Sequence, residues 1–274
     1  MSQNVVRVAV SGATGRMGRE VLKAIEAAEG MLLVAAIDRL NAGEDSGNVA
    51  GIGANGIPVL ADLEAALKES GAEVLVDFTL PSSVLANLRI ALRLGVSPVV
   101  GTTGLSAENL KEIDELARKQ GVGAFVAPNF AIGAILMMQF AEQAAKYLPD
   151  VEIIELHHEK KVDSPSGTAL LTAQKIEASR QAANAVAISS PEGLIEKAPG
   201  ARGAKNEVTG DVTIHSVRLP GFIAHQEVIF GGLGQILTIR HDSVDRSSFM
   251  PGVILSIRKV RSLTGLTIGL ENLL

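Results

Sequence analysis

The fold is decided near the start of the chain, by the stretch Val5-Val6-Arg7-Val8-Ala9-Val10-Ser11-Gly12-Ala13-Thr14-Gly15-Arg16-Met17-Gly18. Its apolar first half predicts a buried strand, and the spacing of apolar residues after it predicts a helix with one buried face. The glycines between them let backbone N–H groups and the helix N-terminus approach a pyrophosphate. The stretch therefore predicts the strand–turn–helix unit of a dinucleotide-binding fold, with Thr14 where the commoner fingerprint has glycine.

The strand pattern continues through the first half of the chain. Short apolar runs cover residues 32–37, 74–78, 96–100 and 122–126, and amphipathic helices are predicted near 82–94 and 106–120. Apolar strands separated by helices are typical of a parallel sheet covered on both faces. We therefore expect an α/β protein with a Rossmann-type parallel sheet domain.

Asp38 and Arg39 follow the second predicted strand, twenty residues after Gly18. A carboxylate at this point can accept both ribose hydroxyls of NAD, whereas a guanidinium, together with that of Arg16, can neutralise the 2′-phosphate of NADP. The pair indicates a site for NADH or NADPH. The alternative is an ordinary glycine turn followed by a solvated Asp and a surface Arg.

Two further loops follow predicted strands: Gly101-Thr102-Thr103-Gly104 and Ala127-Pro128-Asn129-Phe130. Ligands of parallel α/β sheets bind outside the carboxyl ends of the strands. The small and hydroxylic residues of the first loop suit contact with a nicotinamide ring, and a plain strand-to-helix turn is the alternative. The second loop marks the passage to another domain.

The pattern changes after Asn129. Helices are predicted at 132–147 and 167–180, strands at 151–157, 211–218, 227–230 and 235–241, and mostly loop at 181–210. Successive strands joined by short turns are typical of a mixed or antiparallel sheet. We expect an α+β second domain, and a terminal helix at 251–263 that packs back on the first domain.

Reactive side chains are densest in the block Glu155-Leu156-His157-His158-Glu159-Lys160-Lys161-Val162-Asp163-Ser164-Pro165-Ser166-Gly167-Thr168. Strand alternation places Glu155 and His157 on one face and His158 on the other. Glu155 is thus placed to orient His157, whose imidazole can move a proton near neutral pH. A metal site is disfavoured because adjacent strand residues diverge and the chain has no Cys.

The end of this block is typical of a helix start. Ser166 is placed to cap the helix, and the free N–H groups after it would bind a carboxylate or phosphate. The neighbouring lysines, Lys160 and Lys161, add positive charge, so the block predicts a site for an anionic substrate. The alternative is a solvated charged loop followed by a capping turn.

Composition narrows the class of protein. The chain has 274 residues, 47% of them hydrophobic, so it can build about two domains with sizeable cores. The lack of Cys excludes disulfides, thiolate nucleophiles and iron–sulfur clusters. A net charge of −5 without a basic tail disfavours a nucleic-acid partner. No signal peptide and no apolar run of ~20 residues is visible, so a cytoplasmic protein without a membrane partner is expected.

With these motifs in view, the chain resembles the 4-hydroxy-tetrahydrodipicolinate reductase (dihydrodipicolinate reductase) family over nearly its full length. The resemblance implies NAD(P)H-dependent reduction of 4-hydroxy-tetrahydrodipicolinate to tetrahydrodipicolinate, in diaminopimelate and lysine biosynthesis. It is carried by Gly12–Gly18, Asp38-Arg39, Asp77-Phe78-Thr79, Gly101–Gly104, Asn129-Phe130 and, most specifically, the block from His157 to Thr168.

The resemblance also implies an organisation and a set of site residues. Residues 1–130 plus 241–274 would form the dinucleotide-binding domain and 131–240 the substrate-binding domain, whose sheet would assemble a homotetramer. His157 would be the main acid/base and Lys161 the proton donor. Substrate carboxylates would be held by His158, Ser166, Gly167, Thr168 and Arg246. The cofactor would be held by Gly12, Ala13, Thr14, Gly15, Arg16, Met17, Asp38, Arg39, Gly101, Thr102, Thr103, Ala127, Pro128, Asn129 and Phe130.

Two other functions compete with this interpretation. A homoserine-type dehydrogenase would share the domain plan, whereas a semialdehyde dehydrogenase needs a Cys nucleophile that the chain lacks. A cofactor-sensing protein without turnover would need only the first domain. The block from His157 to Thr168 argues against the sensor, because a sensor needs no second, cationic site.

Overall fold

The computed structural model describes residues 5–185, 203–205 and 209–274. The chain divides into two compact units, Met1–Ile132 with Arg246–Leu274, and Gly133–Asp245. The last strand of the second unit continues to Ser243, so residues 241–245 lie with that unit. Among the described residues no helix combines the length and apolar character needed to cross a membrane.

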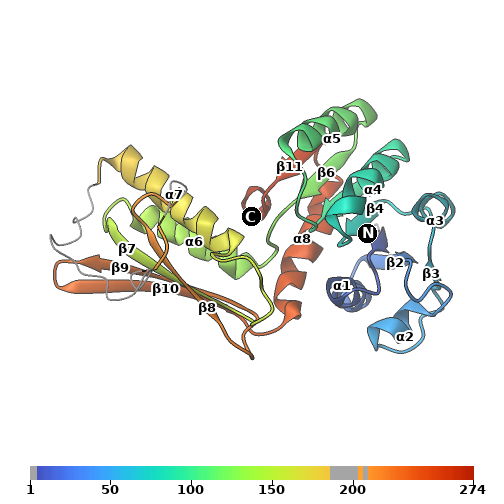
Figure 1. Cartoon of the computed structure of the whole chain (residues 1–274). Helices are drawn as coiled ribbons and strands as arrows, with labels where there is room; N and C mark the ends of the chain where they lie inside the picture. Colours follow the sequence, from blue (N-terminus) through green and yellow to red (C-terminus); the bar gives the residue numbers. More distant parts are fainter. Residues whose placement is uncertain (1–4, 186–202, 206–208) are drawn as a thin grey trace. The chain divides into compact units, whose positions relative to one another are not determined.

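The first unit is built on a seven-stranded sheet in which every pairing is parallel (Figure 1). Its order is β11-β6-β5-β4-β1-β2-β3. The strands are β1 (Val6–Ser11), β2 (Met31–Ile37), β3 (Val59–Leu60), β4 (Val74–Asp77), β5 (Ser97–Val100), β6 (Gly123–Val126) and β11 (Gly265–Ile268). The predicted Rossmann-type parallel sheet is confirmed. The short strands β3 and β11 were not predicted from the sequence.

Helices cover both faces of this sheet. On one face, apolar residues of α3, α4 and α5 pack against the strands; on the other, α8 packs against α1 and the central strands. The helices are α1 (Arg16–Ala27), α2 (Ser46–Ala50), α3 (Leu63–Ser70), α4 (Pro81–Arg93), α5 (Ala107–Gln120) and α8 (Met250–Val260), with 3-10 turns η1 (Arg246–Phe249) and η2 (Leu270–Leu273). The predicted return of the terminal helix to the first domain is confirmed.

The second unit contains a mixed four-stranded sheet of order β10-β9-β7-β8. Strands β7 and β8 are parallel, whereas the other two pairings are antiparallel. The strands are β7 (Asp150–His157), β8 (Thr213–Arg218), β9 (Ala224–Gly232) and β10 (Gln235–Ser243), and the helices are α6 (Ile132–Ala144) and α7 (Gly167–Ala183). Of the segment predicted as loop, residues 186–202 and 206–208 lie outside the described residues.

Side chains alternate along β7 as the sequence predicts. Val151, Ile153 and Glu155 are buried on one face, whereas Ile154 and Leu156 are only partly buried. The strand ends at His157, so His158 opens the following loop. One acidic residue is thereby placed in an apolar core, which requires a compensating set of polar partners.

Candidate active site

The turn between β1 and α1 needs its glycines. Gly12 has a φ of 78°, and a Cβ there would lie 2.7 Å from the carbonyl oxygen of Phe78. A Cβ at Gly18 would lie 2.0 Å from the carbonyl oxygen of Gly12, so α1 packs against its own turn. Gly15 caps α1 without a side-chain hydrogen bond. The N-terminal N–H groups of α1 therefore lack a side-chain cap, as an anion-binding helix start requires.

Thr14 and Asp38 are joined across this turn. The backbone nitrogen and hydroxyl of Thr14 donate to Asp38 Oδ2 at 3.1 and 2.8 Å, and the Leu40 nitrogen donates to Asp38 Oδ1 at 3.1 Å. Thr14 thus gives the carboxylate a fixed orientation that a glycine, with no hydroxyl, could support only through its backbone.

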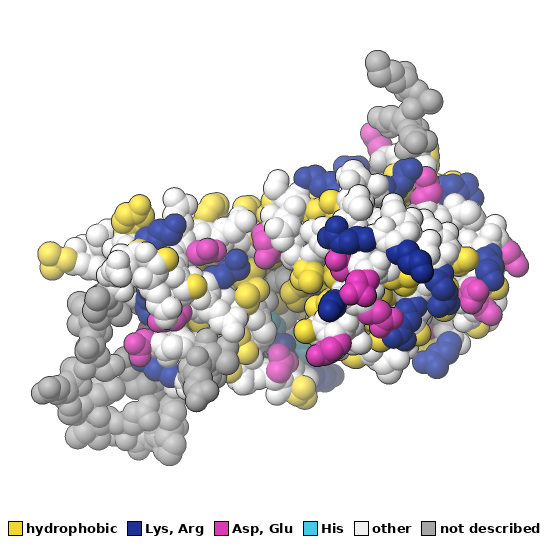
Figure 2. Space-filling view, turned by 90° about the horizontal axis from the view of Figure 1, so that it is seen from above, with side chains coloured by type: hydrophobic (Ala, Val, Ile, Leu, Met, Phe, Trp, Pro, Cys, Tyr) yellow, Lys and Arg dark blue, Asp and Glu magenta, His cyan; other side chains and the backbone are white. Residues whose placement is uncertain are grey.

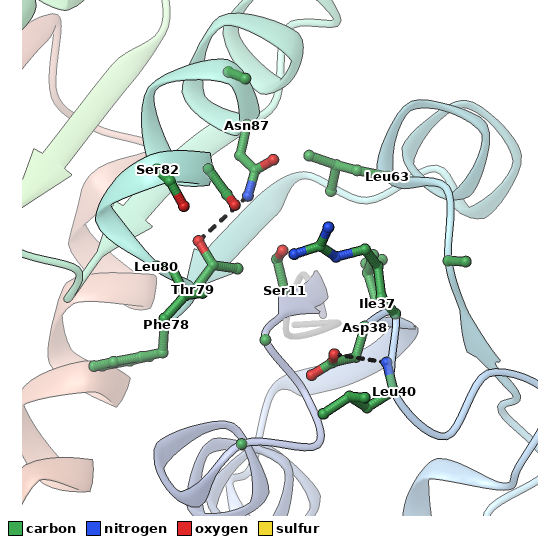
Figure 3. Close-up of a pocket in the computed structure, with 16 residues that line it drawn as sticks. Ser11, Ile37, Asp38, Leu40, Leu63, Phe78, Thr79, Leu80, Ser82 and Asn87 are labelled. Carbon is green, nitrogen blue, oxygen red and sulfur yellow. Dashed lines mark hydrogen bonds between the residues drawn. The ribbon is translucent and has the colours of Figure 1, made fainter.

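The turn, the end of β2 and the start of α4 enclose a cavity of about 750 Å³. Figure 3 shows Asp38 and Ser11 facing Thr79 and Asn87 across this space. The lining residues are Ser11, Gly12, Gly15, Ile37, Asp38, Arg39, Leu40, Ala61, Leu63, Phe78, Thr79, Leu80, Ser82, Ser83, Ala86 and Asn87. Its size, its apolar walls and its few oriented polar groups fit the nucleotide part of a dinucleotide.

Phe78 lies where the predicted cofactor loops meet. A Cβ at Gly101 would lie 2.0 Å from the Phe78 ring, and the ring of Phe130 lies 5.7 Å from it, centroid to centroid. Since Gly12 abuts the Phe78 carbonyl, three loops far apart in the sequence converge here. The remaining predicted cofactor residues do not line the cavity; they are Ala13, Thr14, Arg16, Met17, Gly101, Thr102, Thr103, Ala127, Pro128, Asn129 and Phe130.

Asp77 is a fully buried carboxylate beneath these loops. Its Oδ1 accepts hydrogen bonds from the nitrogen and hydroxyl of Thr79 and from the hydroxyl of Thr102, and its Oδ2 accepts one from Asn87. Burial raises the pKa of Asp77, and hydrogen bonds from Thr79, Asn87 and Thr102 offset that rise only in part. Asp77 and Thr79 belong to the family motif of the sequence, whereas a role for Asn87 was not predicted.

A second polar cluster lies in the other unit, around Glu155. This carboxylate is fully buried and accepts hydrogen bonds from His157 Nδ1, from the Ser166 nitrogen at 3.2 Å and from both terminal nitrogens of Arg218. Burial alone would raise the pKa of Glu155, but hydrogen bonds from His157 and Arg218 lower it to about 2. The predicted contact between Glu155 and His157 is confirmed, whereas Arg218 was not foreseen.

Lys161 lies in the loop that follows, four positions after His157. Its Nζ is 2.7 Å from each oxygen of Asp163, and its backbone nitrogen donates to the His158 carbonyl. The hydrogen bond from Lys161 lowers the pKa of Asp163. The exposed Lys160 takes no part in these contacts. His157 and Lys161, the two predicted proton carriers, therefore lie four residues apart in one segment, and each side chain is hydrogen-bonded to a carboxylate of that segment, Glu155 or Asp163.

The predicted start of α7 is confirmed. Ser166 is its N-cap and accepts a hydrogen bond from the Ala169 nitrogen. Apart from its chain neighbours and the backbone of its own helix, no described atom lies within 4 Å of a Cβ built on Gly167, so there is open space beside this residue. Thr168 lies in the first turn of α7. Arg246 begins η1 and belongs to the first unit, whereas His158, Ser166, Gly167 and Thr168 belong to the second.

Comparison with known proteins identifies the chain's relatives. Residues 6–130 match the family model "Dihydrodipicolinate reductase, N-terminus", and residues 133–274 match "Dihydrodipicolinate reductase, C-terminus". The chain is 51% identical to a 4-hydroxy-tetrahydrodipicolinate reductase of Moorella thermoacetica and 54% identical to one of Desulfitobacterium hafniense, each over 98% of both chains. It is also similar to the dipicolinate-bound dihydrodipicolinate reductase from Paenisporosarcina sp. TG-14, with a TM-score of 0.85 and 44% identity over 98% of this chain and 100% of that one.

The fold and the comparisons together define an oxidoreductase built on a nucleotide-binding parallel sheet, with a separate α+β unit. Its polar sites are the glycine turn, the cavity beside Asp38 and the cluster around Glu155. The chain belongs to the dihydrodipicolinate reductase family.

Proposed function

We propose that this chain reduces 4-hydroxy-tetrahydrodipicolinate to tetrahydrodipicolinate with NADH or NADPH, as a step of diaminopimelate and lysine biosynthesis. The observation that carries the proposal is the buried contact between Glu155 and His157 on β7, followed by Lys161 in the next loop. This arrangement supplies proton-transferring groups beside an open helix end suited to an anion.

The first unit would hold the cofactor. The turn Gly12–Met17 would present backbone N–H groups and the start of α1 to the pyrophosphate, and Asp38 would accept the ribose hydroxyls. Arg16 and Arg39 would neutralise a 2′-phosphate. The loops 101–103 and 127–130, which meet at Phe78, would border the nicotinamide. When bound, the nicotinamide supplies the hydride of the reduction.

His157 and Lys161 would supply the proton. Once the 4-hydroxyl has left as water, reduction of the unsaturated ring would add a hydride at one ring carbon and would require one proton at the adjoining atom. Because Glu155 engages Nδ1 of His157, Nε2 is the imidazole atom available for proton exchange. Lys161 would hand over its proton after leaving Asp163, and His157 would act as the main acid/base.

The carboxylates of the substrate need positive partners. The start of α7 would hold one of them at Gly167 and Thr168, whereas the Ser166 nitrogen is already bound to Glu155. His158 would donate to a carboxylate from the loop that follows β7. Binding in this way would fix the ring relative to the proton donors.

A homotetramer assembled through the second unit is part of the proposal. The edge strand β10 carries exposed apolar side chains, with Ile236 76% and Leu237 39% exposed in the single chain. Such residues on a sheet edge are typical of an interface. Light scattering should give four times the chain mass of 28.5 kDa, and a monomer would contradict this part.

The reaction is tested by following NADH and NADPH oxidation with freshly prepared substrate. We expect His157→Gln and Lys161→Met each to lower kcat by ~10²–10⁴-fold, the usual value of general acid–base catalysis. Lys160→Met is the matched control for the chemical step: it removes the adjacent exposed lysine, whose charge would affect substrate binding and therefore KM, and it should leave kcat within about twofold of the wild type. Wild-type turnover in both of the first two variants would refute the proposed roles.

A further inference from the structure

The polar partners of Glu155 extend well beyond His157. Arg218 lies opposite His157 in the parallel pairing of β7 with β8, and its guanidinium binds both oxygens of Glu155, at 2.9 and 2.7 Å. Two parallel N–H···O bonds fix both distance and orientation. The ion pair therefore holds the carboxylate in one place beneath the imidazole.

The contact with Glu155 determines which nitrogen of His157 carries hydrogen. An ionised carboxylate only accepts hydrogen bonds, so Nδ1 of His157 must be the donor. In the neutral ring, Nε2 is then the unprotonated atom. Without Glu155 either nitrogen could carry the hydrogen. A fraction of the protein molecules would then hold the imidazole as the Nε2–H tautomer, in which Nε2 cannot accept a proton.

Arg218 also reaches the loop that carries Lys161. Its Nη2 nitrogen, which binds Glu155 Oε1, also donates to the backbone carbonyl of Asp163 at 2.7 Å. At the other end of the loop, the Ser166 nitrogen donates to Glu155. The loop 158–166 is thus attached to one buried ion pair at two points, close to Lys161 and at the start of α7.

We infer that Glu155 and Arg218 form a positioning pair for proton transfer. Glu155 holds His157 with Nδ1 protonated and Nε2 free, and Arg218 holds the loop that presents Lys161. Neither residue needs to touch the substrate. The inference rests on the proposed roles of His157 and Lys161, and it assigns to Glu155 and Arg218 a function beyond stabilising the second unit.

The test compares two carboxylates of the same strand. Glu155→Gln keeps the shape of the side chain but lets its amide donate as well as accept, so it no longer selects one tautomer. Glu152→Gln is the matched control. Glu152 lies on the opposite face of β7 and binds a different imidazole, with 2.8 Å between its carboxylate oxygen and Nε2 of His215. Both variants are checked for native circular dichroism and unchanged oligomeric state.

The first readout is the ¹⁵N NMR spectrum of His157 in the protein without substrate or cofactor. We expect the Nδ1–H tautomer in the wild type and in Glu152→Gln, and a mixture of tautomers in Glu155→Gln. Predominance of the Nε2–H form in the wild type, or an unchanged spectrum in Glu155→Gln, would overturn the inference. This readout does not depend on turnover, so it stands even if His157→Gln proves to be fully active.

The second readout is steady-state kinetics with the full-length enzyme. We expect Glu155→Gln and Arg218→Lys to lower kcat by about 10–100-fold, the loss that removal of the partner orienting a metal-bound histidine typically causes, with KM for NADH unchanged. Arg218→Lys keeps a positive charge beside Glu155 but cannot bind Glu155 and the Asp163 carbonyl together. Wild-type kcat in either variant would overturn that residue's positioning role, while low activity of His157→Gln would leave the proposed function intact.

Discussion

Asp77 and Glu155 are both fully buried carboxylates, yet they are held in opposite ways. Asp77, at the end of β4, accepts hydrogen bonds from Thr79, Asn87 and Thr102, all of which are uncharged. Glu155, near the end of β7, is bound by Arg218 and His157. The pKa of Asp77 is raised by its burial, whereas the pKa of Glu155 is lowered to about 2 because its hydrogen bonds outweigh burial.

The difference shows that burial alone does not decide the charge of a site. Neutral donors orient the carboxyl of Asp77 and tie the loops of the first unit together, and this needs two accepting oxygens but no neighbouring cation. The second unit requires an ionised Glu155, because only the charge compensates Arg218 and selects one tautomer of His157. One carboxyl therefore acts through its shape and the other through its charge.

The largest expected effect comes from removing Arg218, the cation that is paired with Glu155. Arg218→Met leaves a buried carboxylate without its ion partner, so we expect the free energy of unfolding to fall by about 3–5 kcal/mol at neutral pH. Urea denaturation measures this. The double variant Arg218→Met/Glu155→Leu removes the stranded charge and should recover much of the loss. If the double variant is as unstable as the sum of the single ones, packing rather than charge explains the effect.

The next effect is the pH dependence of stability that Glu155 introduces. Its pKa is 4.5 when unfolded and about 2 when folded, so the stabilising contribution is complete above pH 4.5 and is lost as the pH falls toward 2. The shift corresponds to about 3 kcal/mol. Urea titrations across this range should show that the stability difference between wild type and Glu155→Gln disappears in acid. A difference independent of pH would contradict the assignment.

Asp77→Asn should show a smaller effect with the opposite slope. Because the folded pKa of Asp77 is raised above 3.8, the folded protein loses stability as the pH rises from 3.8 through the folded pKa. The amide is uncharged like the protonated carboxyl, but its NH2 group faces the Asn87 amide that donates to Oδ2. We therefore expect the free energy of unfolding to lie about 1–3 kcal/mol below that of the wild type in acid, and this deficit to shrink as the pH rises. The same urea titrations test this, and a loss that grows with pH would contradict it.

The contrast between the two carboxylates also separates what could be predicted from the sequence from what could not. The glycine turn, the contact of Glu155 with His157 and the cap at Ser166 are local patterns, and each was predicted correctly. Arg218 lies 63 residues from Glu155 and meets it only through the pairing of β8 with β7. A lone Arg at the end of a strand carries no signal of that pairing.

The cofactor cavity shows the same limit. Asp38 and Gly12 could be predicted to line it, because both follow strands at positions that the dinucleotide fold fixes. Ser82, Ser83 and Asn87 line it only because α4 begins at Pro81 beside the turn, a placement set by packing against the sheet. The short strand β11 was missed for a similar reason: its four residues gain their pairing from the neighbouring β6.

The smallest expected effect concerns an exposed ion pair, which tests whether burial makes the pair of Arg218 and Glu155 strong. Arg89 and Glu112 also form a bidentate pair, through Nε and Nη2 at 2.6 and 2.7 Å, but both side chains are more than 40% exposed. Water screens the pair and solvates either partner when the other is removed. A double-mutant cycle of Arg89→Ala and Glu112→Ala should therefore give a coupling energy within experimental error of zero, at low salt as at high salt. A large coupling would mean that bidentate geometry suffices without burial, and the distinction drawn between Asp77 and Glu155 would have to be revised.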